Sequence, residues 1–226
     1  MDARPREPVA AAGRDRLRVT EIFHSLQGES RSVGWPTVFV RLTGCPLRCG
    51  YCDTAYAFHG GRWMTIPEVL DRVGGHGARF VTVTGGEPLA QKAVHGLLET
   101  LCDRGYEVSL ETSGALDVSG VDSRVVKVLD LKTPGSGEAH RNRLDNLPRL
   151  TPADQVKFVV CDRADYEWAR QMVQAHELAA RCEVLFAPSH GQLAPGTLAD
   201  WILADGLAVR LQIQLHKYLW GDVAGR

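Results

Sequence analysis

The stretch Thr37-Val38-Phe39-Val40-Arg41-Leu42, followed at once by Thr43-Gly44-Cys45, sets the pattern that repeats along this chain. An apolar, β-branched run that is typical of a buried strand ends in a short polar turn containing glycine. Similar runs recur over residues 80–83, 108–110, 125–131, 156–160 and 183–186. The sequence therefore contains six candidate core strands.

Helical periodicity fills most of the gaps between these runs. Thr65-Ile66-Pro67-Glu68 has the N-cap, the early proline and the acidic third residue of a helix start, and it predicts a helix to about Val73. Apolar residues at helical spacing predict further helices over 89–104, 164–178 and 198–205. Gly105 and Gly206 are typical stop signals for the first and the last of these three.

Strands that alternate with helices form βα units and a mainly parallel sheet. Six core strands are too few for a closed eight-stranded barrel, which takes roughly 250 residues. We therefore expect an α/β fold built as a partial, open βα barrel with about six parallel core strands. Flanking strands are expected near residues 18–23 and 209–215, and the segment 133–152 is expected to be a loop with at most one helical turn.

The composition is that of a globular protein, with 226 residues of which 44% are apolar and 23% are charged. Residues 1–16 lack the apolar segment of a signal peptide, so we expect a flexible tail followed by a single domain over 17–226. The net charge of -1 gives no electrostatic reason to expect a nucleic-acid or anionic-membrane partner. No stretch approaches the ~20 apolar residues of a transmembrane helix.

Polar and glycine-rich segments follow the predicted strand ends. They are Thr43-Gly44-Cys45, Thr84-Gly85-Gly86-Glu87-Pro88, Glu111-Thr112-Ser113-Gly114, Asp130-Leu131-Lys132 and Ala187-Pro188-Ser189-His190. In a parallel barrel the carboxyl ends of the strands share one rim, where such folds place their active sites. This clustering indicates an enzyme.

Three of the six cysteines lie within eight positions, as Cys45-x3-Cys49-x2-Cys52. The loop is too short to spread three thiolates, so they must converge on one small object. A disulfide would leave one thiol over, and structural zinc normally takes four protein ligands, of which His59 is a conceivable fourth. A cubane iron–sulfur cluster held by three cysteines leaves one iron open for a ligand, and we favour it over zinc or a plain structural loop. Crowded rather than evenly spaced cysteines indicate a reducing, cytoplasmic compartment.

The cysteine spacing, with aromatic Tyr51 before the last cysteine, resembles the radical S-adenosylmethionine superfamily. The second hallmark of that superfamily is Gly85-Gly86-Glu87-Pro88 after the second strand. The resemblance implies that the open iron chelates S-adenosylmethionine and that one electron cleaves its sulfonium bond to give a 5′-deoxyadenosyl radical. The protein then has to position the reactants, shield them and supply electrons.

The resemblance narrows to the 7-carboxy-7-deazaguanine synthase family. The segments that carry it are Ser25-Leu26-Gln27-Gly28-Glu29, Val38 to Cys45, Cys52-Asp53-Thr54, Thr84 to Pro88, Leu110 to Gly114, Asp130 to Gly137 and Leu211 to Gly221. The family rearranges 6-carboxy-5,6,7,8-tetrahydropterin to 7-carboxy-7-deazaguanine with loss of ammonia, in queuosine and 7-deazapurine biosynthesis. This implies a carbon–nitrogen lyase with a 4Fe-4S cluster and magnesium, a flavodoxin- or ferredoxin-type electron donor, and a homodimer.

Several residues would then contact the substrate. Arg41 would offer a bidentate fork to the substrate carboxylate, the alternative being an ion pair at the strand end. Thr54 resembles the magnesium ligand of the family, because magnesium takes few protein ligands and completes its shell with substrate and water oxygens. The remaining substrate residues implied by the resemblance are Leu26, Gln27, Gly28, Glu29, Thr84 and His216, the last placed on the final strand or serving as a structural histidine.

A second group would surround the S-adenosylmethionine. Its members are Tyr51, Asp53, Gly85, Gly86, Glu87, Ser113, Asp130, Leu131, Lys132, Pro188 and Ser189. Gly86 would let the backbone approach the methionine amine because it has no Cβ. Many family members have Ser-Pro-Lys in place of Asp130-Leu131-Lys132. Some relatives end soon after the final strand and bind substrate with their terminal carboxylate, a contact not expected here because residues 222–226 continue past Gly221.

Two rival interpretations remain. A glycyl-radical-enzyme activase shares the cysteine spacing, the cofactor and a similar length, but Ser25 to Glu29 and His216-Lys217 suit a small polar substrate better. A non-catalytic zinc or electron-transfer module would not need the Gly85 to Pro88 motif or a rim of polar strand ends.

Overall fold

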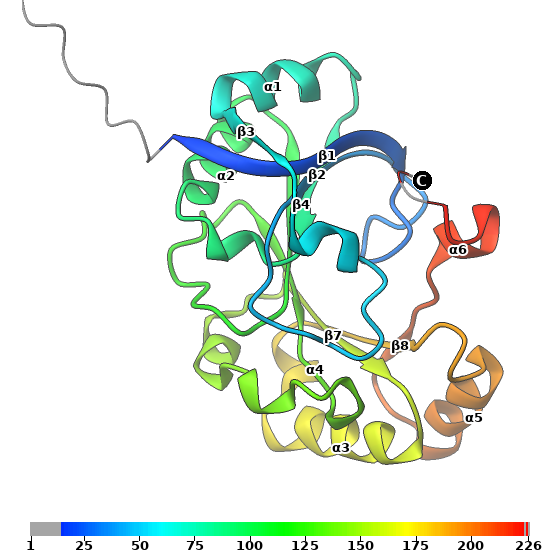
Figure 1. Cartoon of the computed structure of the whole chain (residues 1–226). Helices are drawn as coiled ribbons and strands as arrows, with labels where there is room; N and C mark the ends of the chain where they lie inside the picture. The colour runs from blue at the N-terminus through cyan, green and yellow to red at the C-terminus, as the bar shows by residue number, and fades with distance from the viewer. Residues whose placement is uncertain (1–14, 224, 226) are drawn as a thin grey trace, which may run out of the picture.

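The computed structural model describes residues 15–223 and 225. Within these residues nine strands form one sheet, in the order β3-β1-β2-β4-β5-β6-β7-β8-β9. Strand β1 pairs antiparallel with β2 and with β3, whereas all pairs from β2 onward are parallel. Since β3 and β9 stand at the two ends of this order, the sheet curves without closing (Figure 1).

The strands are β1 (Arg16–Leu26), β2 (Pro36–Leu42), β3 (Arg62–Thr65), β4 (Phe80–Gly85), β5 (Glu107–Thr112), β6 (Val126–Asp130), β7 (Gln155–Val160), β8 (Glu183–Pro188) and β9 (Arg210–Leu211). The α-helices are α1 (Ile66–Gly74), α2 (Val94–Asp103), α3 (Arg163–Ala175), α4 (Leu178–Arg181), α5 (Pro195–Asp205) and α6 (Leu215–Trp220). Helices α1 to α5 cover the outside of the sheet, and α6 lies apart from them (Figure 1). No helix in the described part of the chain is long and apolar enough to cross a membrane.

The six parallel core strands β2, β4, β5, β6, β7 and β8 confirm the predicted partial, open βα barrel. Period-two alternation divides their side chains between the two faces of the sheet. On β7, for example, Val156, Phe158 and Val160 join the core under the helices, whereas Lys157 and Val159 face a cleft on the other side. The same alternation on the neighbouring strands gives the barrel an apolar outer face and a polar interior.

Two predicted helix boundaries agree with the structure. Thr65 caps α1 in a capping box, since its hydroxyl accepts from the Glu68 backbone N–H and the Glu68 carboxylate accepts from the Thr65 N–H. Gly206 ends α5 in the left-handed conformation with φ of 58°.

Two other predicted helices are interrupted. The segment 89–104 splits into a 3-10 turn, η2 (Pro88–Ala90), and α2. Gln91 lies between them, and its side chain forms hydrogen bonds with the backbone of Arg18 and Thr43. The segment 164–178 ends as α3 at Ala175, and Glu177, with φ of 51°, turns the chain into α4.

The predicted final strand over 209–215 is wrong beyond Leu211. Ladder pairing with β8 covers Arg210 and Leu211. The side chains of Gln212 and Gln214 then bind the backbone of Ser30 and the carboxylate of Glu29, and the chain turns into α6. His216 therefore lies on a helix and not on a strand.

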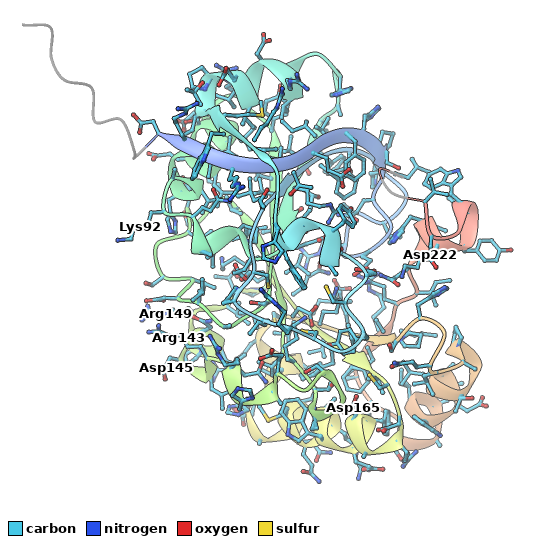
Figure 2. All side chains as sticks on the ribbon, in the orientation of Figure 1. Lys92, Arg143, Asp145, Arg149, Asp165 and Asp222 are labelled. Carbon is cyan, nitrogen blue, oxygen red and sulfur yellow. The ribbon has the colours of Figure 1, made fainter. Side chains whose placement is uncertain are left out.

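The segment 133–152 contains more structure than predicted, in three 3-10 turns: η3 (Pro134–Ser136), η4 (Ala139–Arg141) and η5 (Leu144–Arg149). Asp165 on α3, seen near the base of Figure 2, anchors the first of these by accepting from Gly135 N and Thr133 Oγ1. Arg143 and Arg149 lie on the outer surface in the same view, where both pair with Asp117. The edge strand β3 and the turn η1 (Ala55–Phe58) were not predicted. Residues 1–14 of the predicted tail lie outside the described residues, and Arg16 already pairs in the sheet with Thr65.

The buried ion pair between Asp154 and Lys127 gives a test of the sheet. Asp154 is fully buried, lies 3.0 Å from Lys127 Nζ, and also accepts from the backbone N–H groups of Lys127 and Thr151. Asp154→Ala leaves a buried ammonium unpaired, so the free energy of unfolding should fall by about 3–5 kcal/mol in denaturant titrations. Glu107→Ala breaks an exposed pair with Arg79 and should cost at most about 1 kcal/mol. Equal losses in the two variants would contradict this account.

Candidate functional site

One cleft at the carboxyl ends of the parallel strands collects nearly all of the predicted site residues. Those that line it are Leu26, Gln27, Gly28, Glu29, Arg41, Cys45, Cys49, Tyr51, Cys52, Asp53, Thr54, Thr84, Gly85, Gly86, Ser113, Asp130, Lys132, Pro188, Ser189 and His216. The structure places two others elsewhere: Leu131 is fully buried in the hydrophobic core, and Glu87 is fully buried beneath the rim. Neither side chain lines the cleft.

The turn after β4 is locked against the start of the cysteine loop. Gly86 N donates to Leu42 O at 3.2 Å, and Glu87 N donates to Gly44 O at 2.8 Å. A Cβ on Gly86 would lie 2.1 Å from Gly44 O and 2.8 Å from Cys45 Cβ. The missing side chain of Gly86 is thus required by the cysteine loop itself, a reason that the sequence did not reveal.

Glu87 joins this turn to the next strand. Its carboxylate accepts from Leu89 N, from Thr112 Oγ1, and from both the N–H and the hydroxyl of Ser113. The strand ends of β4 and β5 are therefore fixed relative to each other. Glu87 acts as a positioning residue for Ser113, which does line the cleft.

The three thiols of Cys45, Cys49 and Cys52 are free and open into this cleft. Burial raises the pKa of the Cys45 thiol, and it raises the pKa of Cys49 to about 11. Within the described residues no three His, Cys, Asp or Glu side chains converge as they would around one metal ion. A cubane cluster binds each cysteine through a different iron and can be held by three, whereas structural zinc normally takes four protein ligands, so three thiols on one loop fit a cluster better than zinc.

Two buried polar atoms beside the thiols have no hydrogen-bond partner, Tyr51 Oη and Asp130 Oδ1. Both residues line the cleft, and Lys132 lies between them, 2.8 Å from Asp130 Oδ2 and 5.7 Å from the centre of the Tyr51 ring. Burial by itself would raise the pKa of Asp130, but Lys132 and Lys157 hold it below its ordinary value. An ionised acceptor and an unused hydroxyl fit a polar cofactor with hydroxyl or amine donors.

On the opposite side of the cleft the turn after β1 is held by glutamine side chains. Glu29 N donates to Gln27 Oε1, Ser30 N to Gln212 Oε1 and Arg31 N to Gln155 Oε1. The Glu29 carboxylate accepts from Lys157 Nζ at 2.7 Å and from Gln214 Nε2 at 2.9 Å. Burial alone would raise the pKa of Glu29, but Lys157 lowers it, so Glu29 is ionised at neutral pH.

Glu111 stands next to this turn. It accepts from Thr84 Oγ1 at 2.8 Å and from Gln27 Nε2 at 3.4 Å, which joins two predicted substrate residues to one carboxyl group. Burial and the nearby charge of Glu29 raise the pKa of Glu111. A carboxyl group in this setting can accept or donate a hydrogen bond, depending on its protonation.

For Arg41 the sequence left two interpretations, a fork for the substrate carboxylate and an ion pair at the strand end, and the structure has features of both. Its Nε lies 2.7 Å from Glu21 Oε1, so the strand-end ion pair is present. Its guanidinium nevertheless lines the cleft, packed 5.7 Å from the ring centre of Phe23 and 5.8 Å from that of Tyr56. Because the ion pair uses Nε, the terminal Nη groups of this cleft-lining residue remain available to a second acceptor.

Helix α6 closes the open side of the cleft. Leu215 N donates to Gly28 O at 3.0 Å, and a Cβ on Gly28 would lie 2.0 Å from His216 Nδ1. Lys217 Nζ lies 3.2 Å from Asp53 Oδ2, while Asp53 Oδ1 accepts from the Thr54 hydroxyl at 2.9 Å. Burial lowers the pKa of His216, which favours its neutral imidazole.

Sequence reasoning assigned no specific role to several polar residues of the cleft, among them Glu111, Lys157, Gln214 and Lys217. A usable signal existed for two of them. Lys157 is a charge inside the otherwise apolar run Val156 to Val160, and Glu111 begins the polar segment after Leu110. Gln214 and Lys217 were hidden by the incorrect final strand.

Comparisons with known proteins agree with this arrangement. The family model described as the radical SAM superfamily matches residues 39–130. A protein of Chlorobaculum tepidum named 7-carboxy-7-deazaguanine synthase is 48% identical over 211 residues, which cover 92% of this chain and 96% of that relative. A protein of the same name from Koribacter versatilis is 44% identical over 223 residues, covering 90% of this chain and 97% of the relative. Among solved structures, QueE from Escherichia coli has a TM-score of 0.73 at 22% identity, covering 89% of this chain and 95% of that one, which supports the fold.

The contact between Gly86 and the cysteine loop can be tested with a pair of alanine variants. Gly86→Ala places a methyl group against backbone atoms that cannot move aside, so the cysteine loop should be displaced. The absorbance of the cluster after anaerobic reconstitution should then fall several-fold. Gly50 lies in the same loop with nothing within 4 Å of its Cβ position, so Gly50→Ala should reconstitute normally. Normal cluster content in Gly86→Ala would contradict this account of the turn.

Proposed function

The chain belongs to the 7-carboxy-7-deazaguanine synthase family of the radical S-adenosylmethionine superfamily, and on this premise we propose how its cleft performs that reaction. The substrate is 6-carboxy-5,6,7,8-tetrahydropterin, and the product is 7-carboxy-7-deazaguanine, formed by ring contraction with loss of ammonia. The enzyme is then a carbon–nitrogen lyase.

A 4Fe-4S cluster, S-adenosylmethionine and magnesium are the cofactors of this family, and the residues of the cleft fit all three. Cys45, Cys49 and Cys52 would hold the cluster, with the turn at Gly85 and Gly86 beside it. When bound, the cluster and S-adenosylmethionine supply one-electron chemistry strong enough to remove hydrogen from an unactivated carbon. The open acceptor of Asp130 and the unused hydroxyl of Tyr51 would bind polar groups of the cofactor.

The observation that carries the proposal is the meeting of two unlike sets of residues in one cleft. The thiol loop and its glycine turn occupy one side, and a partly buried set of charged and amide groups around Glu29, Arg41 and Glu111 occupies the other. A pterin has a row of ring donors and acceptors as well as a carboxylate. Ionised Glu29 would accept from ring N–H groups, and the Thr84–Glu111–Gln27 group would bind a second part of the ring edge.

The substrate carboxylate would be bound from two directions. The terminal Nη groups of Arg41 would form a fork with it, since the Nε edge is already held by Glu21. Thr54, whose hydroxyl now donates to Asp53, would ligate magnesium together with the substrate carboxylate and water. His216, held against Gly28 at the mouth, would contact the substrate as a neutral imidazole.

Further features of the protein follow from the same proposal. We propose a single radical S-adenosylmethionine domain over residues 17–226, a cytoplasmic location, a homodimer, and a flavodoxin- or ferredoxin-type electron donor. The charges in the cleft disfavour the glycyl-radical-enzyme activase. Largely buried charged groups such as Glu29 and Lys157 suit a small polar molecule better than a polypeptide backbone. Three cysteine ligands fall short of the four that structural zinc normally takes, which disfavours a zinc module.

The assignment can be tested directly on the anaerobically reconstituted protein. Incubation with the carboxytetrahydropterin, S-adenosylmethionine, magnesium and dithionite should produce the ultraviolet chromophore of a deazaguanine, confirmed by mass spectrometry. Omission of magnesium should slow product formation. Cleavage of S-adenosylmethionine to deoxyadenosine without any deazapurine would refute the substrate assignment while retaining the radical chemistry.

Arg41→Lys tests the carboxylate fork. Lysine can keep an ion pair with Glu21 but cannot form two parallel hydrogen bonds, so KM for the pterin should rise about tenfold, equal to about 1.4 kcal/mol of binding. We expect kcat to fall as well, because this carboxylate is attached to C6, the ring carbon that has to be positioned for hydrogen removal. Arg79→Lys changes an exposed arginine and should leave both constants as in the wild type. An unchanged KM in Arg41→Lys would leave Arg41 with its structural ion pair alone.

A further inference from the structure

Lys157 stands between the two halves of the cleft. It pairs directly with Asp130 in the parallel register of β6 and β7, and its backbone C=O accepts from Leu131 N at 2.8 Å. Its ammonium lies 2.7 Å from Glu29 Oε2 and 3.5 Å from Asp130 Oδ2. One cation thus contacts a carboxylate of the substrate side and a carboxylate of the cofactor side.

The surroundings keep this ammonium in place. Its side chain is 13% exposed, and burial alone would lower the pKa of Lys157. The carboxylates of Glu29, Asp130 and Glu111 outweigh burial and hold that pKa well above its usual range. Lys157 is therefore charged throughout the neutral pH range, and its Nζ has three donors to divide among these acceptors.

The two carboxylates depend on Lys157 to different degrees. Asp130 has a second cation, Lys132, at 2.8 Å from the same Oδ2. The Glu29 carboxylate has no other cation within ion-pair distance in the described part of the chain, and its remaining donors are the neutral amides of Gln212 and Gln214. The ionisation of Glu29 therefore rests on how closely Lys157 approaches it.

Resting on the function proposed above, we propose that Lys157 is a positioning residue that couples the cofactor site to the substrate site as the shared counterion of Asp130 and Glu29. A ligand donor that reaches the free Oδ1 of Asp130 neutralises part of the carboxylate charge. The attraction of Asp130 for Lys157 then weakens, and Lys157 binds Glu29 more completely. The Glu29 carboxylate, which is already ionised, is then held more firmly in place when the cofactor is present, and the effect is reciprocal by linkage.

The test measures binding rather than turnover. Affinity for the carboxytetrahydropterin is measured by calorimetry on protein with an oxidised cluster and no reductant, with and without saturating S-adenosylmethionine. Direct contact between the two ligands contributes equally in every variant, so the difference between variants isolates Lys157. The cofactor should tighten pterin binding at least about fivefold in the wild type and in Lys157→Arg, but less than about twofold in Lys157→Met.

The pH dependence of pterin binding separates this role from a purely structural one. Without Lys157, Glu29 keeps its burial and its negative neighbours Glu111 and Asp53, and His216 is its ionisable neighbour on α6. The pKa of Glu29 should rise, so in Lys157→Met the carboxylate takes up a proton at a higher pH than in the wild type, and pterin affinity should increase more steeply as the pH increases. Lys157→Arg should show the flatter profile of the wild type. Thermal melting followed by circular dichroism verifies that both variants are folded.

Each outcome bears on the proposal. The proposal is overturned if Lys157→Met keeps both the full effect of S-adenosylmethionine on pterin affinity and the wild-type pH profile. It is also overturned if Lys157→Arg loses that effect, since arginine preserves the positive charge. If the wild type makes the deazapurine but S-adenosylmethionine does not change its affinity for the pterin, the role of Lys157 is refuted while the proposed function stands. If the wild type binds no pterin, both fail.

Discussion

The close backbone contact between the Gly85–Gly86 turn and the start of the cysteine loop is the constraint on which the rest of the site depends. Gly86 and Glu87 donate to carbonyls of Leu42 and Gly44, and a methyl group does not fit between the two segments. Strand β2 delivers the loop and β4 delivers the turn, and the two strands are neighbours in the sheet. The first of the three cysteines, Cys45, is therefore placed by the pairing of these two strands. Glu87 extends this fixed unit to β5 through Thr112 and Ser113.

The interior of the barrel is organised by charge in place of apolar packing. Carboxylates from β5 and β6 and ammonium groups of Lys132 and Lys157 alternate across the strand ends, each balanced by a neighbour. Such a set is costly to bury, and it persists because every member has an opposite charge or several donors beside it. The benefit is a cleft whose polar groups are already oriented before a ligand arrives. Water and mobile side chains then have little reorganisation to undergo when reactants bind.

The sequence was informative wherever one local pattern decided the structure. Buried strands, the capping box at Thr65 and the glycine stop at Gly206 follow from neighbouring residues, and the cleft residues follow because parallel strand ends share a rim. It failed where a distant partner decided the outcome. The Gln91 side chain interrupts the predicted helix and hydrogen-bonds to the backbone of Arg18 and Thr43. The side chains of Gln212 and Gln214 hydrogen-bond to the turn after β1, where the predicted strand does not continue. The contact between His216 and Gly28 belongs to the same class, because α6 replaced the expected strand. The pattern of apolar and polar residues in the C-terminal segment does not predict the long-range hydrogen bonds of Gln212 and Gln214.

The contact between His216 and Gly28 also limits which substitutions relatives of this chain can carry at these two positions. The imidazole of His216 occupies the space where any side chain at position 28 would begin. The two positions stand near opposite ends of the chain, yet the size of the side chain at one limits the size of the side chain at the other. A mutation that adds a side chain at 28 is viable when position 216 has already become small, and a smaller residue at 216 leaves a gap that a glycine at 28 cannot fill. Lineages should therefore change both positions together or neither, and paired substitution at these two sites would mark the branches in which the mouth of the cleft was rebuilt.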